Sequence, residues 1–372
     1  MIHRFIELFG ERLPDIPVLA TDNSPLQTHS IWAVGNTAVP RRLNETAVDV
    51  VSLTGQLADP QREPVTGDTV VYCYYTTSTV FIARIAVALW DDSAATTYVY
   101  TDSVGLGRSL QPTWKPDGSK ILFRAKGSGS VCNLIKDMNP DGSSPTTLYT
   151  GGAEVENPVY NHDGTRIAWV EANTIKTANA DGSSPSTIFT PGGITVVATT
   201  VAWQHGANVL AFRHDGGTFT SNEIWKTMTD TGGSVTTYLT ISRASGYGPG
   251  DGDPGPIMYS WLANDTDIVS TVRVTSDPDP DSRLGLIDSG GLTYITPAQY
   301  GASNAGSQDT RPAAITGRSE GVERLYWMSD PSGLEVVSVL PDGSDFRVDW
   351  DGAGLTAGGS IFQGFRGDTQ NV

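Results

Sequence analysis

Hydrophobic and polar residues alternate along this chain in short runs, and the runs are separated by turns that contain Gly or Asp. In KPDGSKILFRA (115–125), Pro-Asp-Gly forms the turn, and the run after it places Ile121 and Phe123 on one face. A period of two is typical of a strand with one buried face. Asp-Gly suits the turn of a β-hairpin because Gly accepts a positive φ. The pattern therefore predicts hairpins of short antiparallel strands.

The same layout returns at intervals along the sequence. PTWKPDGSKILF (112–123) and PVYNHDGTRIAW (158–169) match closely, and TVAWQHGANVLAF (200–212) matches more loosely. A second hairpin recurs in NPDGSSPTTLYT (139–150) and NADGSSPSTIFT (179–190). Extended leads open six units, and they lie near Pro64, Pro112, Pro158, Thr200, Pro256 and Pro312. Their spacings, about 42 to 56 residues, suit the four-stranded blades of a β-propeller.

The two ends of the chain each supply part of a further blade. Residues 30–55 read as three strands without an opening strand, and GGSIFQGF (358–365) reads as a lone strand. A ring closes without an exposed edge when both chain ends share one blade. The sequence therefore predicts an all-β fold, a seven-bladed β-propeller of four-stranded antiparallel blades over 26–372. A composite blade from 30–55 and 358–366 closes this ring, and six blades are the alternative.

Residues 1–25 lie outside the repeats and are expected to form a short N-terminal helical arm. Before Pro14, five hydrophobic residues share one face of an amphipathic helix. These residues are Ile2, Phe5, Ile6, Phe9 and Leu13. Two interpretations stay open: the helix caps one end of the propeller, or it docks onto another subunit of an assembly.

The repeated motif, aromatic–x–Pro/His–Asp–Gly–x–Lys/Arg–Ile–x–aromatic, resembles the repeat of TolB-like β-propellers. It is also similar to the repeat in the propeller domains of prolyl-oligopeptidase-type peptidases. The motif is sharp at Trp114–Phe123 and Tyr160–Trp169, fair at Trp203–Phe212, and degraded at Trp261–Ser270, where NDTD replaces the turn. For a TolB-like protein, the resemblance implies protein–protein interaction in the bacterial envelope.

Large aromatic residues at the strand ends are expected to pack between neighbouring blades and to hold the ring together. Their buried area is large, and a position at the end of a strand brings them against the next sheet. The residues concerned are Trp114, Trp169, Trp203 and Trp261. We therefore interpret them as structural rather than as a ligand-binding aromatic cage.

Composition and charge restrict the partners. The net charge is −17, which argues against nucleic acid because phosphate binding needs clustered Lys and Arg. No stretch approaches the ~20 apolar residues of a membrane span. Residues 1–15 do not read as a secretory signal, because charged residues interrupt the apolar run. Cys73 and Cys132 lie in strand-like runs and are expected to be buried small hydrophobes.

Sequence motifs for catalysis are absent. The chain has no G-x-S-x-G nucleophile elbow, no H-E-x-x-H, no C-x-x-C and no phosphate loop. The histidines are spread along the chain, at His3, His29, His162, His205 and His214. His162 and His205 occupy turn positions of the repeat, which favours a structural role for both.

One acidic stretch is a candidate metal site. DPDPDSRLGLID (277–288) carries carboxylates at alternating positions and again at the twelfth position. The candidate ligands are Asp277, Asp279, Asp281 and Asp288. If the loop curls around an ion, these groups can converge on Ca²⁺, which takes six to eight oxygen ligands. Ser282 stands where such a loop normally has Gly, and a solvated acidic hairpin loop is the alternative.

Three classes of function remain. The leading interpretation is a non-enzymatic structural or interaction protein of a virion, in a phage tail, a baseplate or the capsid surface. Its partners would be other subunits of the assembly and a glycan or protein of the host surface. The first alternative is a soluble TolB-like protein-binding scaffold, for which the absence of a secretory signal predicts a cytoplasmic location. The second alternative is a propeller-type carbohydrate-active lyase.

Overall fold

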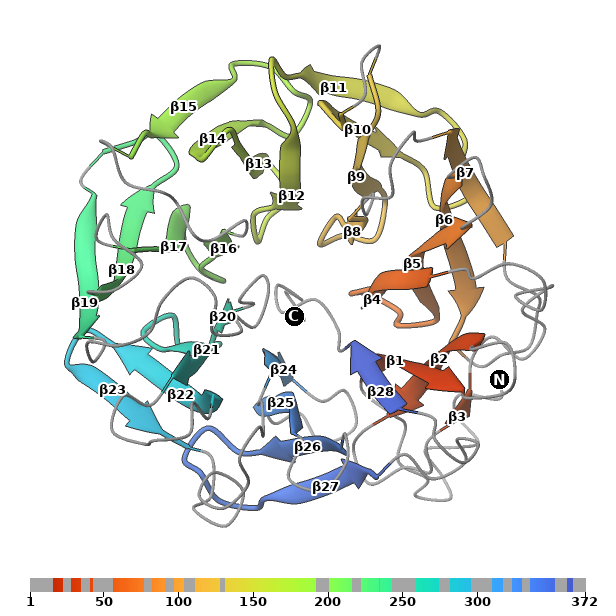
Figure 1. The fold of residues 1–372 in the computed structure, drawn as a ribbon. Coiled ribbons are helices and arrows are strands. Elements are labelled where there is room, and N and C mark those ends of the chain that lie inside the picture. Colours follow the sequence, from red (N-terminus) through yellow and green to blue (C-terminus); the bar gives the residue numbers. More distant parts are fainter. Residues whose placement is uncertain are drawn as a thin grey trace.

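The computed structural model arranges the chain as a ring of β-sheets (Figure 1). It describes residues 16–22, 28–34, 41–42, 56–76, 82–90, 97–103, 111–127, 131–191, 201–215, 222–233, 235–242, 259–273, 282–295, 310–316, 323–329, 335–351 and 360–363. These residues contain no helix, and hence none that could cross a membrane. Their strands form seven four-stranded antiparallel sheets, so the predicted all-β, seven-bladed propeller is confirmed.

We number the blades 1 to 7 around the ring and give the strands of each from the innermost outward. Blade 1 contains β28 (Ser360–Gln363), β1 (Ile16–Asp22), β2 (Thr28–Val34) and β3 (Arg41–Arg42); blade 2 contains β4 (Gln56–Arg62), β5 (Thr69–Thr76), β6 (Ile82–Leu89) and β7 (Thr97–Ser103); blade 3 contains β8 (Thr113–Trp114), β9 (Ile121–Ala125), β10 (Leu134–Met138) and β11 (Thr146–Thr150). Blade 4 contains β12 (Val155–Tyr160), β13 (Arg166–Glu171), β14 (Thr174–Asn179) and β15 (Ser186–Phe189); blade 5 contains β16 (Ala202–Trp203), β17 (Val209–Asp215), β18 (Asn222–Thr229) and β19 (Thr236–Ser242). Blade 6 contains β20 (Tyr259–Trp261), β21 (Ile268–Arg273), β22 (Ser282–Asp288) and β23 (Gly291–Tyr294); blade 7 contains β24 (Thr310–Thr316), β25 (Glu323–Ser329), β26 (Glu335–Val339) and β27 (Arg347–Trp350).

Blade 1 closes the ring by joining strands from the two ends of the chain. β28 is its innermost strand and pairs antiparallel with β1, with Ala20 opposite Ile361 and Thr21 opposite Ser360. Figure 1 shows the blue β28 beside the red strands of blade 1. A blade shared by the two ends of the chain is therefore present, with its C-terminal strand inside the expected 358–366, but its N-terminal strands lie at 16–42 and not within the expected 30–55.

The N-terminal strands of blade 1 begin earlier than the sequence predicted. β1 lies within residues 1–25, which were assigned to a separate arm, so the expected boundary after residue 25 is wrong. Pro17 argues against a strand in this part of the sequence, because proline cannot donate to a sheet ladder. It is tolerated here because it is the second residue of β1. Residues 1–15, which carry the expected amphipathic helix, lie outside the described residues.

Proline marks the innermost strand in several blades. The registers of β4, β12 and β24 each shift by a bulge, and Pro60, Pro158 and Pro312 lie within these bulges. A bulged residue leaves the hydrogen-bonded ladder, so a residue without an N–H fits there. The expected lead at Pro64 is wrong, because this residue lies in the turn after β4.

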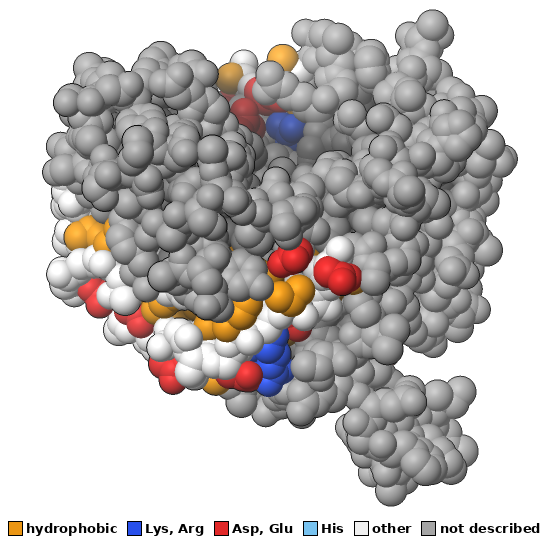
Figure 2. Space-filling model, turned by 60° about the horizontal axis from the view of Figure 1, so that its bottom comes forward, with side chains coloured by type: hydrophobic (Ala, Val, Ile, Leu, Met, Phe, Trp, Pro, Cys, Tyr) orange, Lys and Arg blue, Asp and Glu red, His pale blue; other side chains and the backbone are white. Residues whose placement is uncertain are grey.

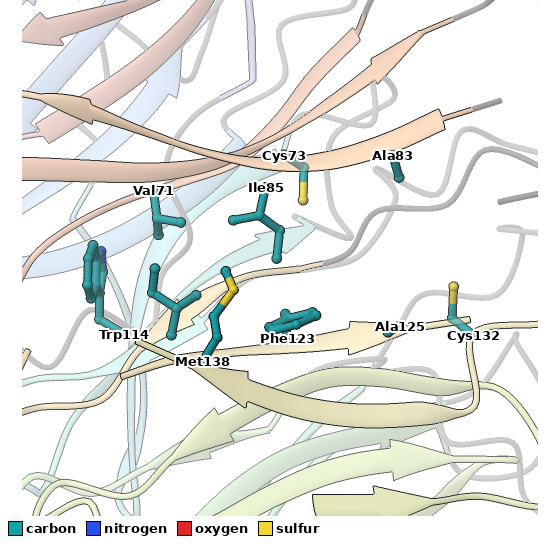
Figure 3. Close-up of a cluster of buried hydrophobic side chains, with 10 residues drawn as sticks. Val71, Cys73, Ala83, Ile85, Trp114, Phe123, Ala125, Cys132 and Met138 are labelled. Carbon is teal, nitrogen blue, oxygen red and sulfur yellow. The ribbon is translucent and has the colours of Figure 1, made fainter. Parts of the chain in front are cut away.

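The core lies between the blades rather than within any one of them. One buried cluster takes Val71, Cys73 and Ile85 from blade 2 and Trp114 and Phe123 from blade 3. Figure 3 shows these side chains between the two sheets. Burial of apolar area is favourable by roughly 25 cal/mol per Å². Each interface of this kind therefore holds two adjacent blades together.

The structure confirms the interpretation of the large aromatic residues and of the cysteines. The four tryptophans named above are at most 5% exposed: Trp114, Trp169, Trp203 and Trp261. Cys73 and Cys132 are both buried, and neither forms a disulfide. Both cysteines belong to the cluster between blades 2 and 3, where they serve as small apolar side chains.

A second contact between blades joins an outer turn to the outer strand of the preceding blade. The outer strands of blades 2, 3 and 4 each carry a β-bulge, at Val99, Leu148 and Ile188. The backbone of these residues lies against glycines of positive φ in the next blade, namely Gly142, Gly182 and Gly232. We call this the glycine–bulge contact. It explains why the Gly of the outer turn recurs from blade to blade.

Substitution of Gly182 by Ala tests the glycine–bulge contact. A Cβ at this position would overlap with the carbonyl oxygen of Leu148, and the φ of +82° already disfavours any other residue. We expect Gly182→Ala to lower the free energy of unfolding by roughly 3 kcal/mol or more, the sum of overpacking and backbone strain. Urea denaturation measures this change.

Gly343 provides the matched control. Its φ is +80°, but a Cβ there would meet none of the described residues within 4 Å. We expect Gly343→Ala to cost only the backbone strain, about 1–2 kcal/mol. Equal losses in the two variants would show that the contact with the preceding blade contributes nothing.

Candidate functional site

The two faces of the ring carry connections of different length. Because adjacent strands are antiparallel, the turns between the first and second and between the third and fourth strands of a blade leave from one face, here called the turn face. The other connections leave from the opposite face, here called the loop face. The described inner turns of the turn face are 63–68, 115–120, 161–165, 204–208 and 262–267. On the loop face, longer stretches of sequence separate β15 from β16, β19 from β20 and β23 from β24: residues 190–201, 243–258 and 295–309, most of which lie outside the described part.

Inner turns bond to residues of the next blade. Asn161 Nδ2 donates to Asn208 Oδ1 over 2.6 Å and so joins blade 4 to blade 5. The backbone N–H of Ala263 donates to Glu323 Oε1 over 2.8 Å and joins blade 6 to blade 7. These hydrogen bonds fix the relative positions of the blades on the turn face.

Asp265 makes the most extensive of these connections. Its carboxylate accepts hydrogen bonds from the backbone N–H groups of His205, over 2.6 Å, and Gly206, over 2.7 Å. Its carbonyl accepts a third from Gln204 Nε2 over 2.9 Å. Asp265 lies in the segment NDTD, where the sequence motif is degraded, and has a φ of 55°. The loss of the Pro-Asp-Gly turn in blade 6 is thus accompanied by a contact that locks blade 6 to blade 5.

A small hollow lies where the inner strands of blades 4, 5 and 6 meet. It is lined by Val159, Tyr160, Ala202, Trp203, His205, Ser260 and Trp261. It offers room for about one water molecule. The side chain of His205 is 24% exposed, whereas the tryptophans of the lining are almost fully buried. The hollow is therefore an aromatic recess with a histidine at its margin.

Two polar side chains of the hollow, His205 and Ser260, bond to the backbone. His205 Nδ1 lies 3.1 Å from the carbonyl oxygen of Leu262 and 3.5 Å from Asp265 Oδ1. Ser260 Oγ donates to the carbonyl oxygen of Trp261 over 3.1 Å. Burial raises the pKa of Tyr160, aided by the charges of Asp137 and Asp117, so its hydroxyl stays protonated. A nucleophile needs an adjacent base, whereas Ser260 Oγ and His205 Nδ1 each lie against a backbone carbonyl oxygen.

Charge is dispersed over the described surface. On the face drawn in Figure 2, acidic side chains occur at several separate places, and hydrophobic side chains reach the surface between them. A hollow in the upper part of the view contains both acidic and basic side chains. Within the described ranges, no three His, Cys, Asp or Glu side chains gather as metal ligands would.

The candidate calcium loop lies mostly outside the described residues. Asp277, Asp279 and Asp281 fall in this part, and Asp288 ends the strand β22. Asp288 Oδ1 accepts the backbone N–H groups of Gly290, over 2.6 Å, and Gly291, over 2.7 Å, so it holds the turn to β23.

The prediction that Asp288 completes a twelve-residue calcium loop does not fit this geometry. Strands rise about 3.3 Å per residue, so the extended β22 places Asp288 roughly 20 Å from Ser282. A loop that curls around one ion would bring these two positions together. The other three aspartates remain an untested candidate.

The expected positions of the turn histidines are confirmed, since His162 and His205 lie in the inner turns 161–165 and 204–208. His29 lies in β2 and His214 in β17, and His3 falls outside the described residues. The described histidines thus lie in blade 1 (His29), blade 4 (His162) and blade 5 (His205 and His214). The five hydrophobic residues of the expected docking helix also fall outside the described part.

Sequence reasoning missed a charged cluster between blades 3 and 4. Glu171, which is 5% exposed, accepts hydrogen bonds from Tyr149 Oη over 2.8 Å and pairs with Lys176 Nζ at 2.8 Å. Its other oxygen accepts the N–H of Gly152 over 2.8 Å. Burial raises the pKa of Glu171. The hydrogen bonds from Lys176, Tyr149 and Ala153 lower it by more than burial raises it, so the pKa lies below its ordinary value of 4.5. In the sequence, this cluster is indicated only by Lys176, which follows a hydrophobic residue in the third strand of blade 4. The same pattern recurs in the third strands of blades 3 and 5.

Glu171→Gln tests how far this buried carboxylate stabilises the ring. A neutral amide loses the charge-assisted bonds, so we expect a loss of roughly 1–3 kcal/mol in the free energy of unfolding above about pH 5. A carboxylate with a lowered folded-state pKa stabilises the fold above its unfolded-state pKa and loses this contribution as the pH falls. The difference between the two proteins should therefore shrink between about pH 6 and pH 3.

Chemical denaturation at a series of pH values makes this measurement. Asp181→Asn is the matched control, because Asp181 lies in an exposed outer turn and, within the described part of the chain, its carboxylate bonds only to Ser183 of its own turn. A difference between wild type and Glu171→Gln that does not change with pH would contradict the assignment.

Comparison with known proteins agrees with the fold. No protein-family model matches the chain, and no curated protein matches it. Among solved structures, a puromycin-hydrolysing peptidase of Mycobacterium tuberculosis is similar, with a TM-score of 0.58 at 14% identity, over 93% of this chain and 55% of that one. The propeller domain of the Trilobed protease from Pyrococcus furiosus has a TM-score of 0.52 at 11% identity, over 79% of this chain and 84% of that one. A TolB protein of Agrobacterium tumefaciens has a TM-score of 0.43 at 17% identity, over 61% of this chain and 81% of that one.

These similarities concern the fold alone, because the sequence identities are low. This chain spans about half the length of the peptidase from M. tuberculosis. At the level of the fold, the resemblance inferred from the repeat motif is confirmed for the peptidases, whose propellers have TM-scores of 0.52 and 0.58. The chain is a β-propeller with the architecture of these proteins.

Proposed function

We propose that this protein is a non-enzymatic interaction protein, which uses a rigid propeller to present the loop face to a partner. The observation that carries the proposal is the difference between the two faces. On the turn face, hydrogen bonds such as Asn161–Asn208 and those of Asp265 connect the blades. On the loop face, the strand ends that are joined from one blade to the next are separated by longer stretches of sequence between β15 and β16, β19 and β20, and β23 and β24. Binding residues are concentrated on loops that a rigid scaffold positions.

The finer form of the proposal is a virion subunit in a phage tail, a baseplate or the capsid surface. In this form the N-terminal segment attaches the propeller to a neighbouring subunit, through the hydrophobic positions identified in the sequence. The loop face then meets a glycan or protein of the host surface. The support for this form is the amphipathic pattern of the N-terminal residues and a β-rich scaffold with 41 Gly in 372 residues.

Fractionation of the native source on a density gradient, followed by mass spectrometry of the fractions, tests the finer proposal. We expect the protein to band with particles at a fixed stoichiometry. If it is soluble and monomeric, the virion assignment is wrong. Affinity capture with the isolated propeller would then identify the partner of a soluble scaffold.

Deletion of residues 2–14 tests the attachment role of the N-terminal segment. The deletion must stop before Ile16, because β1 belongs to blade 1 and its loss would open the ring. We expect the shortened protein to keep its melting temperature but to lose incorporation into particles. Phe5→Ser combined with Phe9→Ser is the matched variant of full length, and normal incorporation of both variants would contradict the role.

A further inference from the structure

Tryptophans of the innermost strands share a hydrogen bond that links neighbouring blades. Trp114 Nε1 donates to the carbonyl oxygen of Gln61 over 3.1 Å, and Trp261 Nε1 donates to that of Ala202 over 3.2 Å. In both cases the acceptor is the penultimate residue of the inner strand of the preceding blade. The two bonds are therefore repeats of one contact.

Trp203 occupies the same position in blade 5 but lacks this bond. By the rule of the other two blades, its acceptor would be the carbonyl oxygen of Val159, the penultimate residue of β12. Trp203 is 4% exposed, and among the described residues its Nε1 has no hydrogen-bond acceptor. A buried N–H without an acceptor is costly, because it has lost its bond to water.

The hollow described above lies at this open joint. Both Val159 and Trp203 line it, and it has room for about one water molecule. Trp169 and Trp327 also lack an acceptor, but they are fully buried and do not line the hollow. Trp203 alone of these three therefore combines an unpartnered donor with adjacent space.

We propose that this hollow binds one oxygen acceptor, which receives the indole N–H of Trp203 and takes the place of the missing bond to blade 4. In the free protein the acceptor is a water molecule, and a carboxylate oxygen is the alternative source of the same chemistry. One further side chain can bond to it: the ring of His205 lies at the margin, with Nδ1 directed to the carbonyl of Leu262. A water with several polar partners is a stable part of a structure.

Nuclear magnetic resonance of the indole N–H groups tests the proposal on the full chain. The chain has nine tryptophans, and single Trp→Phe variants assign their signals. We expect the Trp203 signal to show a cross-peak to water and to exchange at least about tenfold faster than the signals of Trp114 and Trp261, because hydrogen-bonded buried groups are protected. If Trp203 exchanges as slowly as these two and shows no cross-peak, the proposal is wrong.

Two kinds of variant separate the site from a merely loose region. Val159→Ile adds a methyl group to the lining and should abolish the water cross-peak while the protein remains folded; a cross-peak that persists would place the water elsewhere. Trp203→Phe removes a donor that has no protein acceptor, and Trp261→Phe removes one that has. We expect Trp261→Phe to lower the melting temperature more than Trp203→Phe does. A larger loss in Trp203→Phe would overturn the assignment.

Titration with acetate distinguishes the two sources of the acceptor. A saturable shift of the Trp203 signal, with loss of the water cross-peak, would show that the hollow also takes a carboxylate. A cross-peak that is unaffected by acetate would assign the site to water alone. Val159→Ile should be insensitive to acetate in either case.

Discussion

Each blade of this propeller is a sheet with two apolar faces, and the neighbouring blades must cover both. Leu122 of blade 3 packs in one cluster with Trp169 of blade 4, and Trp225 of blade 5 packs with Trp261 of blade 6. The strand β9, buried at every position, lies between two such interfaces. Blades stacked in a closed circle leave no apolar face uncovered, so the ring depends on this packing.

Apolar packing holds the blades together but leaves them free to slide, and polar contacts fix their positions. On the outside, the glycine–bulge contacts set the height of one blade against the next. Near the axis, hydrogen bonds from the inner turns also fix the position of one blade against the next, and Asp265 accepts more of these bonds than any other residue named here. The one inner tryptophan that lacks its interblade bond, Trp203, lies beside the hollow. Small differences between repeats thus create the local features of a nearly symmetric ring.

The sequence predicts the blades wherever the turn chemistry is regular. The hairpin at Asp117-Gly118 and its repeats are local signals, and their spacing suffices for the ring. β1 was missed because Pro17 argues against a strand and its partner β28 is distant in sequence. The roles of Asp265 and of Glu171 could not be predicted, because both depend on which residues of the next blade come within reach. Local patterns therefore determine the elements, whereas contacts between blades require the assembled structure.

The pairing of β1 with β28 has a consequence for how the chain folds. Ala20 and Ile361 lie at opposite ends of the sequence, so a newly made chain can form blades 2 to 7 before the innermost strand of blade 1 exists. Until then β1 presents an unpaired edge, and such edges recruit strands from other chains. Contacts of such long sequence separation also form slowly. During synthesis the first blade is thus the last to be completed, and its open edge is the point at which crowded, half-made chains are most prone to aggregate.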